Sequence, residues 1–331
     1  MPDHVSAALR ERIFAVAAEI GYAGPDPAAR TLRTGRHRAL GLLFTDSPTH
    51  AVRDAAAVRF FEGLAVTCEE AEVSLLLIPA VETDQGALGM VAQAAVDGLV
   101  LYSMAADSPH LEVALRRRLP LVVVDSPADV PGADWVGLDD EGNVRQLGEY
   151  LTQLGHRRVG IVCFRLVGDG FSGPVLPSRL ARTTHGVQRS RIDGLLAALG
   201  QAGVDPDQVP VEEVSQNEWR AGVEAGRALL ERHPDLTAIA CTSDVLALGV
   251  LRAARERGLR VPEDLSVAGY DGIEDAAEVG LTTIQQPLVE KGRVAGRLLL
   301  TASPAADGAA PRRQVLATQL RIRRTTGPAL R

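Results

Sequence analysis

The sequence has few cysteines and no long apolar run, and both scarcities exclude classes of protein. Its three cysteines, Cys68, Cys163 and Cys241, lie far apart without CxxC spacing, so they indicate neither a disulfide framework nor a zinc site. No stretch approaches the ~20 apolar residues of a membrane-spanning helix. The N-terminus carries charges every few residues, unlike the apolar core of a secretory signal. We expect a globular protein of the reduced cytoplasm that has no membrane partner.

The sequence also lacks the short motifs of common catalytic sites. It contains no GxSxG, no P-loop and no HExxH, and its seven histidines show no metal-ligand spacing. One GxGxxG pattern occurs, at Gly168, Gly170 and Gly173. However, Pro174 and Pro177 follow at once, where a dinucleotide-binding motif would begin a helix. We therefore expect a protein that is not an enzyme and that needs no cofactor or metal ion.

Present instead is a repeated alternation of short apolar runs with segments of helical period. Continuous apolar runs that alternate with helices are typical of parallel strands buried on both faces of a sheet. The chain holds two series of such runs, which predict an α/β fold with two doubly wound parallel-sheet lobes. The runs span residues 39–44, 73–79, 97–103, 119–125, 134–140 and 157–164 in the first series, and 209–215, 236–244, 265–271 and 281–287 in the second.

Polar residues follow many of these predicted strands. Ligands of open parallel sheets bind beyond the carboxyl ends of the strands, so a site is expected at these positions. A cleft between two lobes, walled by carboxylates and amides, suits a small polyhydroxylated or nitrogenous ligand. The same residues are equally suited to cap the helices that follow the strands. They are Asp46, Ser103, Asp125, Asp139, Asp140, Ser243, Asp244, Asp271 and Gln286.

The N-terminal segment belongs to neither series of strands. The stretch "VSAALRERIFAVAAEIGY" predicts one helix that Ser6 caps and Gly21 ends, with apolar residues at helical spacing. Residues 1–38 also carry six arginines and four acids, although the whole chain has a net charge of −7. This asymmetry indicates a local anionic partner, and a solvated basic linker is the alternative interpretation.

Four stretches carry a family resemblance: "VSAALRERIFAVAAEIGYAGPDPAARTLRTGRHRALGLLF", "YLTQLGHRRVGIV", "SDVLALGVLRAARERGLRVPEDLSVAGYDG" and "LTTIQQP". Together they resemble the lactose and galactose repressor (LacI/GalR) family of bacterial transcription regulators. The resemblance implies a partial all-α DNA-binding headpiece, a hinge helix and two periplasmic-binding-protein-like lobes that form a homodimer. The implied divisions are residues 1–22 for the third headpiece helix, 23–38 for the hinge, 39–161 with 288–316 for the N-terminal lobe, and 162–287 with 317–331 for the C-terminal lobe.

The resemblance also implies a function and leaves two alternatives open. Met1 matches the loop after the recognition helix of the family, so the first two helices of the helix-turn-helix are expected to be missing from this sequence. A late-assigned start or a trimmed chain is one explanation, and a real headless variant is the other. We expect a ligand-responsive DNA-binding regulator, with a headless cytosolic sensor of small molecules as the alternative.

The hinge residues have implied roles at operator DNA. The position matching Leu32 inserts between base pairs in the minor groove, and such apolar wedges bend the duplex. The arginines around it would meet phosphates or the groove floor. The predicted DNA-binding residues are Arg30, Leu32, Arg33, Arg36 and Arg38.

The resemblance also implies an effector site, position by position. Sugar-binding members of the family often have asparagine where this chain has Ser243, which puts the transfer of any particular sugar in doubt. The implied effector-binding residues are Arg191, Asp271, Ser243, Trp219, Gln286, Asp46 and Glu141.

One insertion departs from the family pattern. Residues 165–189 form a longer loop than is usual, and we expect a mobile flap beside the cleft. On it, Arg179, Arg182 and His185 could reach an anionic effector.

Overall fold

The computed structural model describes residues 6–21, 33–45, 48–81, 85–302 and 310–330. Its internal contacts divide the chain into two units, residues 1–38 and residues 39–331. In the first unit, α1 (Ala7–Glu19) is a helix whose N-terminus is capped by Ser6, because its hydroxyl accepts the Leu9 N–H at 3.4 Å. The chain leaves the helix through Gly21 at φ +63°, as the sequence predicts. The large apolar side chains of α1 are exposed.

The second unit contains two sheets, and the first lies in the N-terminal lobe. Its described strands run in the order β12-β5-β4-β3-β1-β2, and all neighbours are parallel. The strands are β1 (Ala39–Phe44), β2 (Ser74–Pro79), β3 (Gly98–Tyr102), β4 (Leu121–Val124), β5 (Asp134–Gly137) and β12 (Arg313–Val315). The lobe's described helices are α3 (Pro48–Ala51), α4 (Ala55–Glu70), α5 (Gln85–Gln93), α6 (Pro109–Arg116) and α13 (Leu288–Leu300).

The second sheet forms the C-terminal lobe, in the order β13-β11-β10-β9-β6-β8-β7. Its inner strands are parallel, and the edge strands β13 and β7 are antiparallel to their neighbours. The strands are β6 (Val159–Phe164), β7 (Gly173–Pro174), β8 (Val211–Val214), β9 (Ala238–Cys241), β10 (Ser266–Asp271), β11 (Thr282–Gln285) and β13 (Gln319–Arg321). The helices are α7 (Asp140–Gln153), α8 (Pro177–Leu180), α9 (Gly186–Gln201), α10 (Trp219–Arg232), α11 (Asp244–Glu256), α12 (Glu274–Glu278) and a 3₁₀ turn, η1 (Pro206–Gln208).

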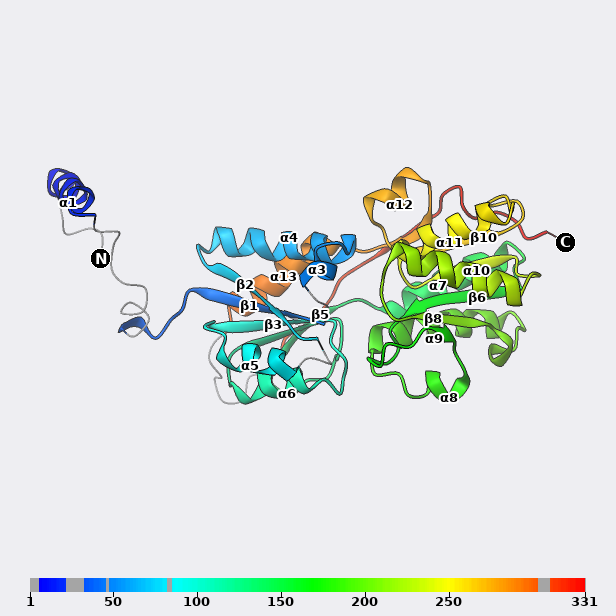
Figure 1. Ribbon diagram of the computed structural model, residues 1–331, viewed down its shortest axis with the longest axis horizontal. Helices are drawn as coiled ribbons and strands as arrows, with labels where there is room; N and C mark the ends of the chain where they lie inside the picture. The colour runs from blue at the N-terminus through cyan, green and yellow to red at the C-terminus, as the bar shows by residue number, and fades with distance from the viewer. Residues whose placement is uncertain (1–5, 22–32, 46–47, 82–84, 303–309, 331) are drawn as a thin grey trace. The chain divides into compact units, whose positions relative to one another are not determined.

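Helices cover both faces of each sheet, which confirms the predicted α/β class with two doubly wound lobes. In the first lobe α4 and α13 pack on one face and α5 and α6 on the other (Figure 1). In the second lobe α10 and α11 cover one face, and α7 and α9 cover the other. Strands such as β1, whose residues are buried from Leu40 to Phe44, are apolar throughout because neither face meets water.

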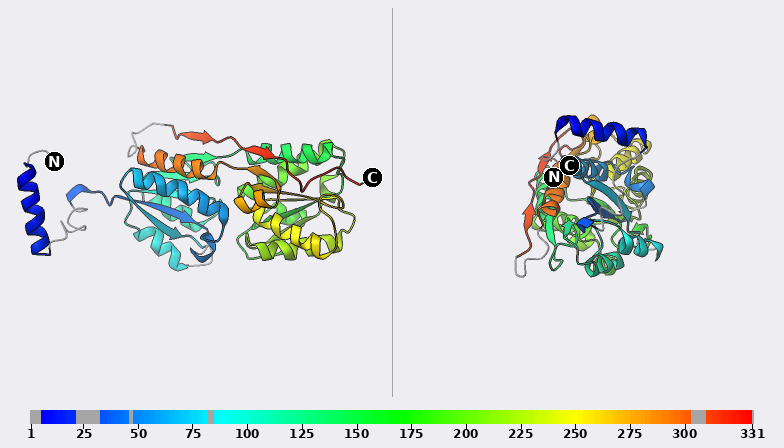
Figure 2. Two further views of the ribbon diagram at one scale, coloured as in Figure 1. Left: turned by 90° about the horizontal axis from the view of Figure 1, so that it is seen from above. Right: turned by 90° about the vertical axis from the view of Figure 1, so that its left-hand side faces the viewer.

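The chain crosses between the lobes three times, and the first crossing corrects the predicted boundary at residue 161. β5 belongs to the first sheet, but α7 packs against α9 and β6 pairs with β8 and β9. The crossing therefore lies just after β5, and residues 140–161 belong to the C-terminal lobe. The later crossings lie between β11 and α13 and between β12 and β13; the last of these runs along one flank of both lobes (Figure 2).

Glycines bring α4 and α13 unusually close together. A Cβ added to Gly63 would lie 1.9 Å from the Val289 carbonyl oxygen, and one added to Gly292 would lie 2.1 Å from the Phe60 carbonyl oxygen. Both distances are far below van der Waals contact. The two helices therefore form a closely packed pair over the first sheet.

This close packing predicts that Gly292→Ala destabilises the protein. The added methyl group meets backbone that cannot rotate away, so we expect a loss of about 1–3 kcal/mol in the free energy of unfolding. Gly89 in α5 is the matched control, because no atom lies within 4 Å of its added Cβ. Gly89→Ala should be neutral or stabilise by up to about 1 kcal/mol through helix propensity. Urea denaturation of both variants measures the effect, and equal stabilities would contradict it.

Candidate functional site

A cleft lies between the two lobes of the second unit, where the strands of both sheets end. Its first-lobe wall includes Ser103 after β3 and Asp125 after β4, and its second-lobe wall includes Arg165 after β6 and Asp271 at the end of β10. Each of these four residues has a positive φ, between +41° and +124°. Such backbone is costly for residues other than glycine and persists where the surroundings hold it. Strained strand ends therefore aim polar side chains into the cleft.

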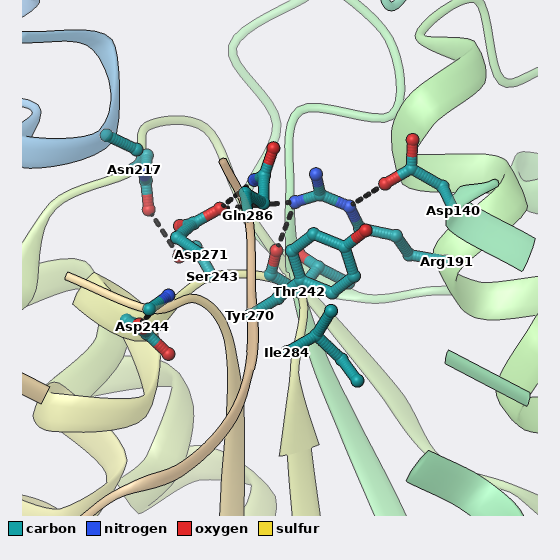
Figure 3. Close-up of polar contacts among 12 residues, drawn as sticks. Asp140, Arg191, Asn217, Thr242, Ser243, Asp244, Tyr270, Asp271, Ile284 and Gln286 are labelled. Atoms are coloured by element: carbon teal, nitrogen blue, oxygen red, sulfur yellow. Dashed lines mark hydrogen bonds and ion pairs between the residues drawn. The ribbon is translucent and has the colours of Figure 1, made fainter. Parts of the chain in front are cut away.

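Arg191 of α9 forms the centre of the second-lobe wall. It is 5% exposed, and its Nε donates to Asp140 Oδ1 at 2.8 Å (Figure 3). Its Nη1 donates to the Thr242 carbonyl oxygen at 2.7 Å and lies 3.8 Å from Asp271 Oδ1. The guanidinium carbon stands 3.7 Å from the centre of the Tyr270 ring, in cation–π geometry. The charge is thus held by two carboxylates and an aromatic face.

Asp271 and Gln286 continue this network toward the first lobe. Gln286 Nε2 donates to Asp271 Oδ1 at 2.6 Å, and Gln286 Oε1 accepts from Lys291 Nζ at 2.7 Å. Lys291, in the first turn of α13, also donates to both Asp125 oxygens at 2.9 and 3.0 Å. Lys291 is 1% exposed, so its three protons are all used inside the protein. Charged groups of the two lobes are therefore linked through Gln286.

A second connection between the lobes runs through Asn217. Its Nδ2 donates to Asp54 Oδ2 at 3.0 Å, and its Oδ1 accepts from the Ser243 hydroxyl at 2.6 Å. Asp54 caps α4 through the amides of Ala56 and Ala57, and it lines the cleft together with Asn217. Asn217 therefore joins the N-terminus of α4 in the first lobe to the N-terminus of α11 in the second.

Asp244 lies beneath Asp271 and fixes its position. Its carboxylate accepts the N–H groups of Gly272 and Ile273 at 2.6 and 3.0 Å and the Thr283 hydroxyl at 2.6 Å. The two amides directly follow Asp271, so Asp244 holds the turn that gives Asp271 its φ of +124°. Asp244 is fully buried and does not line the cleft.

Burial dominates the electrostatics of the site. It raises the pKa of Asp271 well above the ordinary value, and Arg191 lowers it only in part. Burial likewise raises the pKa of Asp125 against the opposing charge of Lys291. For Arg191, burial lowers the pKa, but Asp140, Tyr270 and Asp271 outweigh it, so the pKa lies above its ordinary value. The cleft is therefore a desolvated region in which every charge depends on its partners.

Gln188 of α9 supplies an unused acceptor. The residue is 4% exposed and lines the cleft, and its buried Oε1 has no hydrogen-bond partner among the described residues. A buried polar atom without a partner is costly, and in a cleft it marks a position where a ligand donor fits.

Only some of the predicted effector residues line the cleft. Arg191, Asp271 and Gln286 line the cleft. Ser243 caps α11 and lies behind Asn217, and Trp219, 47% exposed, lines a neighbouring hollow instead. Glu141 pairs with Arg145 on the surface of α7, in the C-terminal rather than the N-terminal lobe. Asp46 lies outside the described residues.

Sequence reasoning missed several cleft residues. Asp54 and Asn217 precede helices rather than end strands, and Tyr102 and Gln188 are hidden in apolar or helical patterns. Asn217 could have been found from the sequence, because it is a polar residue two positions before Trp219, which the resemblance had implied as an effector residue.

The predicted DNA-binding residues all fall within the first unit, residues 1–38. Arg33, Arg36 and Arg38 are exposed in the structure. Arg30 and Leu32 lie outside the described residues.

The GxGxxG loop does not begin a helix, because Gly173 lies in β7 and pairs with Glu213 of β8.

In the described ranges, no group of three or more His, Cys, Asp or Glu side chains is arranged to hold a metal ion. None of the helices in the part of the chain that the structure describes has the length and hydropathy to cross a bilayer.

Two doubly wound lobes with a polar cleft at their strand ends define a periplasmic-binding-protein-like ligand-binding core, and comparison with known proteins agrees. The model of the periplasmic binding protein-like domain matches residues 149–326. An HTH-type transcriptional regulator of Mycolicibacterium smegmatis is 44% identical over 335 residues, which cover 99% of this chain and 90% of that protein.

Solved structures narrow the class to one family. A LacI-family transcriptional regulator from Corynebacterium glutamicum is 35% identical with a TM-score of 0.80, covering 99% of this chain and 92% of the other. The regulator CelR in complex with cellobiose is 28% identical with a TM-score of 0.74, covering 98% and 92%. The chain belongs to the LacI family of ligand-responsive, DNA-binding transcriptional regulators.

The buried position of Asp244 predicts a dependence of stability on pH. Burial raises the pKa of Asp244 from 3.8 to about 7. Between these values the folded protein keeps a proton that the unfolded chain has released, so stability falls as the pH rises through this window. Asp244→Asn keeps comparable hydrogen bonds but does not titrate. Relative to this variant, the wild type should lose about 2–4 kcal/mol between pH 4 and pH 8 in denaturant titrations. A difference that stays constant with pH would rule out this account.

Proposed function

We propose that the effector of this regulator is an uncharged, polyhydroxylated small molecule that binds in the cleft between the lobes. The observation that carries the proposal is the balance of donors and acceptors on the cleft walls. Lys291 donates its hydrogen bonds to Asp125 and Gln286. Arg191 donates from Nε to Asp140 and from Nη1 to the Thr242 carbonyl oxygen. Arg165, a further cation on the cleft wall, donates through Nη1 to the Thr45 carbonyl and hydroxyl oxygens at 3.5 and 3.4 Å. All three cations are therefore engaged by groups of the protein, which leaves them less available to an anionic ligand.

Several acceptors lie on the same walls. Asp54, Asp125 and Asp271 contribute carboxylates, and Gln188 contributes a buried amide oxygen without a partner among the described residues. Hydroxyl groups donate to such acceptors without adding negative charge beside them, whereas a phosphate or carboxylate would be repelled. The complex of CelR with cellobiose supports this ligand class, because cellobiose is a neutral polyol bound by a relative of the chain.

The proposed effector residues are six of those that line the cleft: Arg191, Asp271, Gln286, Asn217, Asp54 and Gln188. Arg191 would act mainly by holding Asp271 and Tyr270, and Asp271 and Gln188 would accept ligand hydroxyls. Ser243 would act through Asn217, which it holds by a hydrogen bond of 2.6 Å. Trp219 and Glu141 do not line the cleft, so no direct role is proposed for them. Asp46 lies outside the described residues and stays a prediction from the resemblance.

Operator binding is the response that the effector would control. Arg33, Arg36 and Arg38 are exposed just before β1, and we assign them to phosphate contacts. Arg30 and the predicted Leu32 wedge complete this hinge. β1 enters the first lobe directly after Arg38, so a change in the lobe reaches the hinge through a short connection. We further assign a homodimer, in which two hinges meet one operator, and no catalytic activity. The regulator names of the relatives disfavour the alternative of a sensor that does not bind DNA.

Ligand class is tested by thermal unfolding with D-glucose and cellobiose against D-glucose 6-phosphate. A neutral sugar that binds should stabilise the protein by about 2.7 kcal/mol at one hundred times its Kd, and the phosphate ester should stabilise it far less.

Asp271→Ala should lose the stabilisation by sugar and the effector response of operator binding, while operator binding itself persists. Stabilisation by the phosphate ester alone, or an unchanged response in Asp271→Ala, would contradict the proposal.

The hinge assignment predicts how DNA affinity depends on salt. Each phosphate contact contributes about 0.9 to the slope of log K against log salt concentration, so Arg36→Ala should reduce the slope by about that amount. Arg59→Ala is the control, because this exposed first-lobe arginine pairs with Glu62 and should leave the slope unchanged. Fluorescence anisotropy with duplex DNA at several salt concentrations gives both slopes, and equal slopes for the two variants would refute the assignment.

A further inference from the structure

Residues 165–188, here called the wall segment, run from the end of β6 into the first turn of α9 and form one side of the cleft. The segment starts at Arg165, whose N–H donates to the Val214 carbonyl of β8 at 2.8 Å. It then adds β7 to the sheet edge and returns through α8. Its two ends meet at Leu166, whose carbonyl accepts the N–H groups of Thr184 and His185 at 2.9 and 3.3 Å. The wall segment is thus a closed loop with many internal hydrogen bonds.

Arg179 holds this loop together from its centre. Its Nε and Nη2 donate to Glu213 of β8 at 2.5 and 2.9 Å, and its Nη1 and Nη2 donate to Asp169 at 2.9 Å each. Its guanidinium carbon lies 4.1 Å from the centre of the Phe171 ring. One planar fork therefore joins two carboxylates and an aromatic ring, which a lysine could not do.

Glu213 gives this arrangement its strength. The side chain is 0% exposed, and its Oε1 also accepts the Leu166 N–H at 2.8 Å. A buried carboxylate needs a compensating cation, so Arg179 is required where it stands. Glu213 lies in β8, so its bonds to Arg179 and to the Leu166 N–H attach the wall segment to the second sheet at two positions. The expectation that Arg179 reaches an effector is wrong, because its fork is used by these two carboxylates and it does not line the cleft.

The end of the wall segment touches both the cleft and the first lobe. His185 and Gln188 line the cleft, and the Thr184 carbonyl oxygen accepts a hydrogen bond of 3.0 Å from the Ala106 N–H of the first lobe. A Cβ added to Gly186 would lie 3.2 Å from Ser126 Oγ, so the two lobes approach closely here. The position of the wall segment therefore decides both a contact surface of the cleft and a contact between the lobes.

We propose that Arg179 is a positioning residue of the effector site: by clasping Asp169 and Glu213, it holds the wall segment so that Gln188 faces the ligand and Thr184 meets Ala106. The inference rests on the proposed function of the cleft as the effector site. It makes the wall segment a built element of ligand recognition that is fixed from a point outside the cleft. Loss of the clasp should free the segment end and weaken its contact with the first lobe.

The chain contains a matched control on the same strand. Glu212, beside Glu213 in β8, is 5% exposed and pairs with Arg232 in the last turn of α10. Successive strand residues point to opposite faces of a sheet, so this second pair lies on the other side of β8. Removing it perturbs a buried glutamate to a comparable degree but leaves the wall segment in place.

The experiment compares Arg179→Met/Glu213→Gln with Arg232→Met/Glu212→Gln in the full chain. The glutamine avoids an uncompensated buried charge, and in the first variant its carbonyl can still accept the Leu166 N–H. Hydrogen–deuterium exchange, measured without added sugar, follows the Ala106 amide in the other lobe. We expect it to exchange at least about tenfold faster in the first variant and at the wild-type rate in the control. Asp169→Ala, which alters an exposed carboxylate, should give a smaller increase of about threefold.

Similar exchange at Ala106 in both double variants, whether fast or slow, would overturn the proposal. If Arg179→Met/Glu213→Gln does not fold, an unchanged Ala106 rate in Asp169→Ala overturns it instead. Because no sugar is present, the result does not depend on the ligand class. Failure of the sugar to stabilise the wild type would count against the proposed effector, whereas failure of the exchange test would count only against the role of Arg179.

Discussion

The buried charge of Arg191 is the constraint on which the site depends. A guanidinium stays ionised under all conditions that a protein meets, so at 5% exposure it must be matched by partners from the surrounding elements. Asp140 from α7 and Asp271 from β10 supply the charge, and Tyr270 supplies its ring face. Removing one partner of such a pair costs about 3–5 kcal/mol. Arg191 therefore holds α9, the end of β10 and the start of α7 in one arrangement.

The same requirement carries the network into the other lobe. Lys291 is also buried and charged, and it finds its partners in Asp125 of the first lobe and in Gln286 at the crossing. Gln286 presents its oxygen to Lys291 and its nitrogen to Asp271, so its amide is oriented by charges on both sides. A ligand that contacts Gln286 or Asp271 thus acts on both lobes at once. It can shift their arrangement only if it binds one arrangement more tightly than the other.

The wall segment follows the same rule at a greater distance from the cleft. Glu212 and Glu213 are adjacent buried acids, and each has its own arginine. The pair at Glu213 joins the wall segment to β8, whereas the pair at Glu212 joins α10 to β8. Removing one partner of a buried ion pair is strongly destabilising, so the geometry that keeps both partners in contact is retained. In this protein that geometry places Gln188 and Thr184 at the edge of the cleft.

The amino-acid sequence by itself determined ten of the thirteen described strands, the doubly wound class and the edge where polar residues gather, but not the short edge strands β7, β12 and β13. These features depend on local apolar runs and on the common direction of parallel strands, which put Ser103, Asp125, Asp271 and Gln286 at one cleft. Only the tertiary structure decided which sheet β6 joins and therefore where the lobes divide, because strand partners are chosen by long-range packing. It also decided the orientation of individual side chains: Trp219 and Glu141 lie outside the cleft, Asn217 and Gln188 lie within it, and Arg179 turns toward Glu213. Those outcomes follow from the need to pair every buried charge and polar atom, which depends on neighbours distant in the sequence.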